Sequence, residues 1–290
     1  MSNVKLTHNM LNPLKDLIID NTYTRKRFKE VFGKQLNISN PQTFNEKIQW
    51  IKLKYRKKYM TQLADKYAVR KYVSKKIGSQ YLNKLIASYS NFENLKKNIN
   101  KLPLSCVIKL THGSGWNVIL NNRRITRNEL TLIKDWIGKN YYFAGREWCY
   151  KDIHPQIICE RLIPHSNKKI GLLDYKIFCF NGEPKFIQVD INRFSNHTRN
   201  IYNCFWGKIP INSYFFKSSN IVIPKPRFLS KILNLSKKLS ENIPLVRVDF
   251  YCEDKIIFGE MTFYPGNGFE KFDPQEYDSI FGSYLKLPKI

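Results

Sequence analysis

Two acidic residues lie inside a segment that otherwise predicts two apolar strands. The segment is VRVDFYCEDKIIFGEMTF, residues 246–263, and it predicts a β-hairpin because β-branched and aromatic residues flank the polar connection CEDK. With a four-residue loop, Arg247 pairs with Glu260, and one face of the hairpin carries Arg247, Asp249, Glu260 and Thr262. Two carboxylates at this spacing suit Mg²⁺ or Mn²⁺, whose ligands are oxygens. The alternative is an Arg–carboxylate ion pair on a solvated face.

A second segment combines a lysine on an apolar strand with a glycine-rich turn. In CVIKLTHGSGWNVIL, Lys109 lies on a predicted strand, and the turn that follows consists of His112, Gly113, Ser114 and Gly115. Backbone N–H groups of such a turn can approach phosphate oxygens, and the lysine adds a point charge. The segment is not a P-loop, because GxxxxGK[ST] is absent and no helix follows directly. The alternative is a hairpin with a half-exposed lysine, in which His112 only supports the turn.

Further charged residues border the next predicted strands. QIICERLI carries Glu160, and Asp174 and Lys176 open the strand DYKIFCF. Taken singly, each is typical of a solvated strand end. Together with Lys109 and the hairpin acids, their order matches a nucleotide cleft between two small sheets, where lysines meet phosphates, one carboxylate meets the base or sugar, and two acids bind metal.

Two more segments are candidates for substrate contacts. DINRFSNHTRNIY carries Arg193 and Arg199 beside a strand, and we expect both to hold the substrate carboxylate or the transferring phosphoryl group; the alternative is a basic surface loop. GREWCY suits stacking on a sugar ring or, equally well, an aromatic edge of the core. Its candidates are Arg146, Trp148 and Tyr150.

The elements that position these residues change in type along the chain. Residues 1–100 predict mainly helix, with Thr43 and Glu46 forming a capping box and Gly78 ending TQLADKYAVRKYVSKKIG. From about residue 104 short strands dominate, interrupted by helical patterns at 126–139 and 227–242. The pattern predicts an α+β fold with largely antiparallel sheet.

The composition limits the partners. The chain has 290 residues, with 49 basic and 23 acidic side chains and a formal charge of +26, which favours a polyanionic partner. Neither an RNA-binding signature nor a Cys/His zinc spacing occurs, so we expect no nucleic acid. The six scattered cysteines predict free thiols in a reducing compartment. Without an apolar run of 18 residues or an apolar leader, we expect a cytoplasmic protein, basic enough to lie on an anionic membrane surface.

The ordered motifs resemble the ATP-grasp superfamily, and closely its TupA-like branch, which is associated with teichuronopeptide and bacterial surface-polysaccharide assembly. The resemblance runs from NPQTFNEKIQW to FEKFDPQEYD and rests on LADKYAVRKYV, VIKLTHGSGWNVI, YYFAGREWCYKDIHPQIICE, DYKIFCFNGEPKFIQVDINRFSNHTRNIY, VRVDFY and FGEMTFYPGNGFEKF. It implies an ATP-grasp fold in which two small, mainly antiparallel α+β subdomains hold ATP. We expect a basic helical region over 1–100, a glycine-loop subdomain with the hinge over 101–163, and a second subdomain with the metal site over 164–290.

The resemblance also implies roles for the ATP-contacting residues. Lys109 is similar to the strand lysine on the ATP phosphates, and the Gly113–Ser114–Gly115 turn to the loop that closes over them. Glu160 and Leu162 resemble the hinge that contacts adenine, and Lys176 resembles the cation of the second sheet.

The implied metal ligands lie on the hairpin. Asp249 and Glu260 resemble the Mg²⁺ ligands, and Arg247 resembles the arginine that steadies an acyl-phosphate. Many ATP-grasp enzymes carry Asn two residues after the metal Glu, whereas Thr262 stands there in this chain, so water can take the place of a third protein ligand.

The resemblance implies a Mg²⁺- and ATP-dependent ligase that joins a carboxylate to an amine through an acyl-phosphate. For this branch the implied acid is a uronic acid of a cell-surface glycan or its sugar precursor, and the amine is an amino acid or amino alcohol. One alternative is a glycosyltransferase, although no DxD motif occurs. The other is a basic, non-enzymatic glycan- or lipid-binding protein, which leaves Asp249 and Glu260 without a function.

Overall fold

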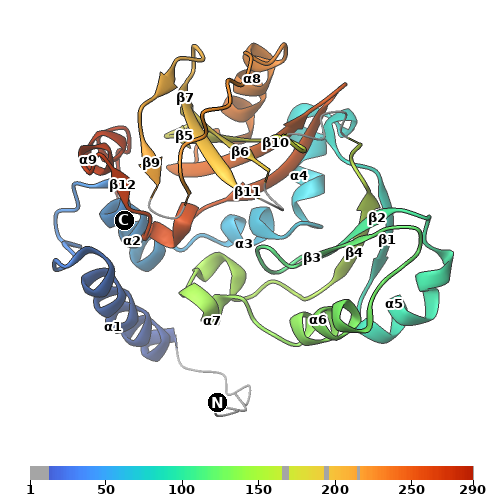
Figure 1. Cartoon of the computed structure of the whole chain (residues 1–290). Helices are drawn as coiled ribbons and strands as arrows, with labels where there is room; N and C mark the ends of the chain where they lie inside the picture. Colours follow the sequence, from blue (N-terminus) through green and yellow to red (C-terminus); the bar gives the residue numbers. More distant parts are fainter. Residues whose placement is uncertain (1–12, 165–169, 193–195, 214–215, 290) are drawn as a thin grey trace.

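Two antiparallel sheets dominate the computed structural model, which describes residues 13–164, 170–192, 196–213 and 216–289 (Figure 1). The four-stranded sheet has the order β1-β4-β2-β3, and the six-stranded sheet has the order β11-β10-β5-β6-β7-β8. The first contains β1 (Leu85–Tyr89), β2 (Cys106–Leu110), β3 (Asn117–Leu120) and β4 (Ile157–Arg161). The second contains β5 (Asp174–Phe180), β6 (Glu183–Ile191), β7 (Thr198–Asn203), β8 (Lys208–Ile209), β10 (Leu245–Cys252) and β11 (Ile256–Thr262). A short pair joins β9 (Asn212–Ser213) to β12 (Phe272–Asp273).

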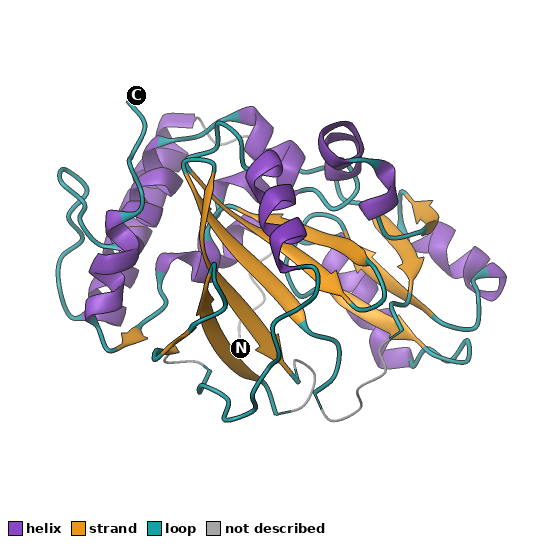
Figure 2. Ribbon diagram, turned by 90° about the horizontal axis from the view of Figure 1, so that it is seen from above, coloured by secondary structure: helices purple, strands orange, loops and turns teal. Residues whose placement is uncertain are grey.

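Helices flank the strands, as Figure 2 shows. They are α1 (Pro13–Phe32), α2 (Phe44–Lys54), α3 (Lys58–Ala64), α4 (Val69–Ile77), α5 (Phe92–Asn98), α6 (Arg127–Ile137), α7 (Tyr142–Gly145), α8 (Leu229–Leu239) and α9 (Glu276–Ser283). The α+β prediction is therefore confirmed. So is the capping box, in which the Thr43 side chain accepts from the Glu46 N–H and the Glu46 side chain accepts from the Thr43 N–H.

The predicted helix before Gly78 is two helices in the structure. The Asp65 carboxylate accepts hydrogen bonds from the backbone N–H groups of Tyr67 and Ala68 at 2.7 and 3.2 Å, so the chain turns there and α4 starts anew. Gly78 then ends α4 with φ of +109°, a conformation that favours glycine.

The four-stranded sheet begins earlier in the chain than the predicted unit boundary at 101. Its edge strand β1, residues 85–89, pairs with β4 and lies inside the region predicted to be mainly helical. A strand this short, with a mixed burial pattern, has weak periodicity. The division into units at 101 and 164 stays a prediction.

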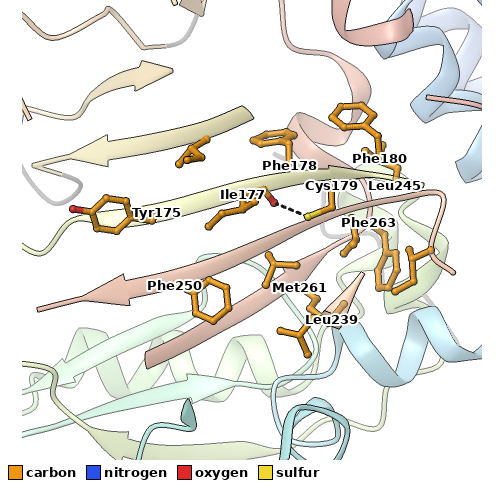
Figure 3. Packing of buried hydrophobic residues seen from close by; sticks show 14 of the residues in the cluster. Tyr175, Ile177, Phe178, Cys179, Phe180, Leu239, Leu245, Phe250, Met261 and Phe263 are labelled. Carbon is orange, nitrogen blue, oxygen red and sulfur yellow. Dashed lines mark hydrogen bonds between the residues drawn. The ribbon is translucent and has the colours of Figure 1, made fainter. Parts of the chain in front are cut away.

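Each sheet has its own hydrophobic core. The larger core surrounds the six-stranded sheet, where α8 packs on β5, β6 and β10. Figure 3 shows Ile177 and Cys179 of β5 among the side chains of this core, together with Leu245, Met261 and Leu239. A separate core holds the four-stranded sheet against α5 and α6. Four of the six cysteines are buried, and all six are free thiols, as predicted. The two cores are separate, and a cleft lies between the two sheets.

The register of the β10–β11 hairpin differs from the prediction. The connection has three residues, 253–255, because Cys252 pairs with Ile256, and Arg247 pairs with Thr262 rather than with Glu260. A bulge on β11 places Gly259 and Glu260 opposite Asp249. The pairing prediction is therefore wrong, but the bulge keeps Glu260 near Arg247 and Asp249.

Candidate active site

A cleft between the two sheets is lined by five of the predicted site residues, namely Lys109, Gly115, Leu162, Asp249 and Glu260. One wall comes from β2 and β3, and the other comes from β10 and β11, with the segment after β4 closing one end. Its apolar lining consists of Val107, Ile119, Leu162, Ile163 and Leu172. Its polar and charged lining includes Lys66, Lys109, Arg161, Asp174, Asp249 and Glu260. An apolar pocket beside a charged region suits a flat heterocycle carrying a polyanionic chain.

The two acids of the hairpin share one guanidinium. Arg247 Nε lies 2.7 Å from Asp249 Oδ1, Arg247 Nη2 lies 2.7 Å from Asp249 Oδ2, and the same Nη2 lies 3.2 Å from Glu260 Oε1. Burial acts to lower the pKa of Arg247, but Asp249 and Glu260 outweigh burial and raise it. Asp249 is buried, whereas Glu260 reaches the cleft with about a quarter of its side chain exposed. The arginine therefore holds both carboxylates at one point of the cleft wall.

Lys176 lies beneath these acids and is 3% exposed. It forms ion pairs with Asp174 and, at 2.8 Å, with Asp249, and Asp190 lies 3.8 Å away. Burial acts to lower the pKa of Lys176, but Asp174 and Asp249 outweigh it and raise the pKa. Lys176 is a countercharge for Asp249 in this structure and is not among the residues that line the cleft.

Lys109 and Glu160 meet on the opposite wall. Lys109 Nζ lies 2.7 Å from Glu160 Oε2, and Arg70 Nη1 lies 2.8 Å from Glu160 Oε1. The second Nη of Arg70 donates to the Asn83 carbonyl at 2.8 Å, which ties α4 to the segment before β1. Helix α4 therefore fixes the carboxylate that the sequence predicts at the nucleotide.

The glycine turn lies against aromatic side chains. A Cβ on Gly113 would lie 2.5 Å from the Trp116 ring, and Gly115 has φ of +74°, so both positions favour glycine. His112 Nε2 lies 3.1 Å from the carbonyls of Trp136 and Lys139, and burial lowers the pKa of His112. This placement agrees with a histidine that supports the turn.

Lys66 links the turn to the metal-ligand candidates. Its ammonium donates to the Gly113 carbonyl at 2.5 Å and lies 3.4 Å from Glu260 Oε2. Lys66 therefore bridges the two walls of the cleft.

Arg199 lies in a second, adjoining charge cluster. Its Nε donates to Asp190 at 2.9 Å, its Nη1 pairs with Glu270, and its guanidinium stacks on Phe216 at 4.5 Å. Burial acts to raise the pKa of Asp190, but His197, Lys176 and Arg199 outweigh burial and lower it. Arg193 lies outside the described residues.

The residues of GREWCY pack inward. Tyr150 is buried and Trp148 packs on the larger core, while Arg146 stacks near Tyr142 and lies 3.9 Å from Asp20. This placement favours the core-edge interpretation over sugar stacking.

Sequence reasoning missed three side chains of the cleft region: Lys66, Arg70 and Trp116. Lys66 and Arg70 belong to LADKYAVRKYV, a segment already used for the resemblance. Helical spacing alone cannot show that Lys66 contacts the glycine turn and β11 or that Arg70 contacts β4. Trp116 directly follows the glycine turn, and this position in the sequence could have indicated that it lies at the cleft.

A sequence model of the TupA-like ATPgrasp family matches residues 46–286. The chain belongs to the TupA-like ATP-grasp family. No match was found among curated proteins.

Several solved ATP-grasp structures are similar to the chain at low identity. The ligase PsnB, complexed with a minimal precursor, has 8% identity and a TM-score of 0.38, with 71% of this chain and 53% of PsnB covered. D-alanine–D-alanine ligase from Bacillus anthracis has 16% identity and a TM-score of 0.38, covering 70% and 57%. A RimK domain protein from Sphaerobacter thermophilus has 9% identity and a TM-score of 0.40, covering 77% and 68%. The chain spans about half the length of PsnB.

Membership of the TupA-like ATP-grasp family confirms the predicted fold. ATP-grasp enzymes of the ligase class use ATP and Mg²⁺, so the family also agrees with the predicted enzyme class and cofactors.

The donor set of the cleft fits a magnesium ion held in part by ATP. Across the described ranges of the chain, no three His, Cys, Asp or Glu side chains form a metal-binding group. The two carboxylates of Asp249 and Glu260 supply hard oxygen donors, and Mg²⁺ commonly takes one or two carboxylates with substrate phosphates and water. The carboxylates of Asp249 and Glu260 therefore fit a magnesium ion that would also be ligated by ATP phosphates.

Proposed function

We propose that this protein is a carboxylate–amine ligase that consumes ATP and releases ADP and phosphate. The observation that carries the proposal is the cleft itself: Lys109 on β2 and the acids Asp249 and Glu260 on β10 and β11 line one cavity from opposite sheets. A cation for phosphates opposite two metal-ligand acids is the charge arrangement that phosphoryl transfer from ATP requires.

The proposed chemistry begins with an unreactive acid. A carboxylate resists attack by an amine because it is anionic and has no usable leaving group. Transfer of the terminal phosphoryl group of ATP to a carboxylate oxygen forms the acyl-phosphate and releases ADP. The amine then attacks the carbonyl carbon, the C–O bond to phosphate breaks, and the amine loses a proton as the amide forms.

The residues of the cleft divide this work. Lys109 holds ATP phosphate oxygens, the turn at Gly113–Ser114–Gly115 covers them, and Glu160 with Leu162 borders the base. Asp249 and Glu260 hold Mg²⁺, which when bound offsets phosphate charge. Lys176 acts through Asp249, because it is buried against that carboxylate.

Arg247 and the cluster around Arg199 belong to the acyl-transfer end of the cleft in this proposal. We assign to Arg247 the role of offsetting charge on the acyl-phosphate, and its position between the two acids supports this role. We assign the substrate carboxylate to Arg193 and Arg199. Arg199 forms ion pairs with Asp190 and Glu270, and these orient its guanidinium. This orientation supports the assignment of Arg199.

The proposed acid is a uronic acid in a bacterial surface polysaccharide, such as a capsule or O-antigen, or in its precursor, and the amine is an amino acid or amino alcohol. Support comes from the family and from the formal charge of +26, which attracts acidic glycans. Work at an anionic membrane surface is part of this proposal. The described helices include none that is long and apolar enough to cross a membrane.

Oxygen transfer tests the reaction. The protein is incubated with Mg²⁺-ATP, a hexuronoside labelled with ¹⁸O in its carboxylate, and a panel of amines, and the phosphate is analysed by mass spectrometry. We expect one labelled phosphate and one ADP for each amide, because the acyl-phosphate passes a carboxylate oxygen to phosphate.

Other products would identify other reactions. AMP with pyrophosphate would indicate an adenylate, and unlabelled phosphate would indicate ATP hydrolysis without ligation. Transfer of a sugar from a nucleotide sugar, without ATP cleavage, would support the glycosyltransferase alternative. Absence of nucleotide consumption with every acid and amine tested would support the non-enzymatic alternative.

A further inference from the structure

An apolar surface lies at the edge of the six-stranded sheet. The turn between β7 and β8 presents Phe205 with 87% of the residue exposed, and the loop before α8 presents Val222 with 88% exposed beside the exposed Ile221. We call Phe205, Ile221 and Val222 the apolar tip. Figure 1 shows β7 and α8 at the top of the molecule, on the side away from α5 and α6. Large apolar side chains exposed as a group indicate an interaction surface.

The scaffold under the apolar tip is well bonded. The Phe205 N–H donates to Asn203 Oδ1 at 2.9 Å, which fixes the turn. Trp206, the next residue, donates from Nε1 to the Ile223 carbonyl at 3.1 Å. Because Trp206 and Ile223 directly follow Phe205 and Val222, this bond joins the two segments that carry the exposed side chains. The exposed side chains are therefore carried by segments that hydrogen bonds hold in place.

The stretch of chain that carries the apolar tip has charges of one sign. Residues 191–240 contain nine Lys or Arg and no Asp or Glu. Four exposed lysines lie on β6 and β8, the two strands that pair with β7, and in the segment between β9 and α8 that also carries Ile221 and Val222. They are Lys185, Lys208, Lys217 and Lys225, which we call the basic border. An apolar group inside a basic border is complementary to a surface that offers hydrocarbon beneath anionic headgroups.

We propose that the apolar tip and its basic border bind an anionic lipid bilayer. A soluble acidic glycan would engage the lysines but would give Phe205 and Val222 no hydrocarbon to enter. In a bilayer those two side chains enter the interface while the lysines reach headgroup phosphates. This inference rests on the membrane-surface part of the proposed function and names the site for it. The tip does not line the cleft, so its test does not depend on the ligase reaction.

The test uses the full chain and sedimentation with vesicles. One preparation contains equimolar phosphatidylglycerol and phosphatidylcholine, and the other contains phosphatidylcholine alone. We expect binding to the anionic vesicles that weakens as salt rises. The variant Phe205→Ser/Val222→Ser should bind about tenfold more weakly or worse. The control Leu104→Ser, at a residue 57% exposed just before β2, should bind as the wild type does.

Thermal unfolding of each variant checks that the fold is retained. A second double variant, Lys185→Glu/Lys225→Glu, keeps the apolar tip and tests whether vesicle binding needs the basic border. Loss of binding in both double variants, with unfolding unchanged, would support the proposal. Unchanged vesicle binding by the serine variant would overturn it. If the wild type bound vesicles of phosphatidylcholine alone as well as anionic vesicles, the charge requirement would be overturned. If the serine variant lost as much affinity for soluble polygalacturonate as for anionic vesicles, the surface would be assigned to glycan instead.

Discussion

At the scale of residues, the charged side chains to which we assign roles in the reaction are paired with one another. Glu160 lies between Lys109 and Arg70, and Arg247 lies between Asp249 and Glu260. A nucleotide and a metal ion that bind as proposed would therefore compete with, or join, these ion pairs. This arrangement keeps the buried charges compensated before ligands arrive.

Glu260→Gln should lower the turnover of ATP by about 100-fold or more, because the change removes one proposed metal-binding charge. The fold should persist, since Glu260 is partly exposed and Asp249 still pairs with Arg247 and Lys176. Single-turnover ATP cleavage and thermal unfolding measure the two effects. Near wild-type turnover at ordinary Mg²⁺ would remove Glu260 from the metal site.

Lys109→Met should weaken ATP binding. Losing a charged hydrogen bond costs about 1.5–3 kcal/mol, or roughly 10- to 100-fold in Kd. Glu160 keeps Arg70 as a partner, so the hinge should remain in place. Isothermal titration with Mg²⁺-ATP gives the Kd, and Lys134→Met on the exposed side of α6 is the matched control. Equal ATP affinity of the two variants would support the alternative, in which Lys109 is a structural lysine of the hairpin.

At the scale of elements, the glycine turn depends on close contact with its neighbours. Gly113 meets Trp116, and His112 anchors the turn to the carbonyl end of α6. The turn is therefore held from both sides, and its backbone position follows from packing as well as from glycine content.

Gly113→Ala should displace the turn, because a new Cβ would lie 2.5 Å from the Trp116 ring. Overpacking of this kind costs about 1–3 kcal/mol of stability, and ATP affinity should fall with it. Gly138→Ala is the control, since its nearest neighbour would be at an ordinary 3.7 Å. Chemical denaturation and ATP titration are the measurements. Indistinguishable behaviour of the two variants would contradict the close-contact argument.

His112→Gln should flatten the pH dependence of stability. Burial lowers the folded-state pKa of His112 below its usual 6.5, so the unfolded chain binds more protons in the window between the two values. The contribution of His112 is then full above pH 6.5 and is lost as pH falls towards the folded-state pKa. Glutamine keeps a donor for the α6 carbonyls without titrating. Urea unfolding from pH 7 to pH 5 measures the slopes, and parallel curves for both proteins would refute the idea.

At the scale of the whole molecule, two cores meet along the cleft, so a ligand that touches both sheets should stabilise the entire chain. Mg²⁺-ATP at about 100 times its Kd should add about 2.7 kcal/mol. For a chain of this size we expect the midpoint to rise by several degrees. Thermal scans with Mg²⁺-ATP, UDP-sugar and heparin separate the alternatives, and a shift with UDP-sugar alone would favour a glycosyltransferase.

The sequence by itself determined the features that depend on local chemistry. The capping box at Thr43, the turn at Gly113–Ser114–Gly115 and the strands that carry Asp249 and Glu260 follow from residue type and spacing over a few positions.

Only the tertiary structure decided which distant charges meet. Arg70 reaches Glu160 across 90 positions, Lys66 joins Gly113 to Glu260, and Lys176 is buried under Asp249 rather than exposed to the cleft. The register of Arg247 also depended on a bulge and a loop one residue shorter than the sequence predicted. The physical reason is that periodicity reports which face of its own element a side chain occupies, whereas pairing across elements depends on how the sheets and helices pack.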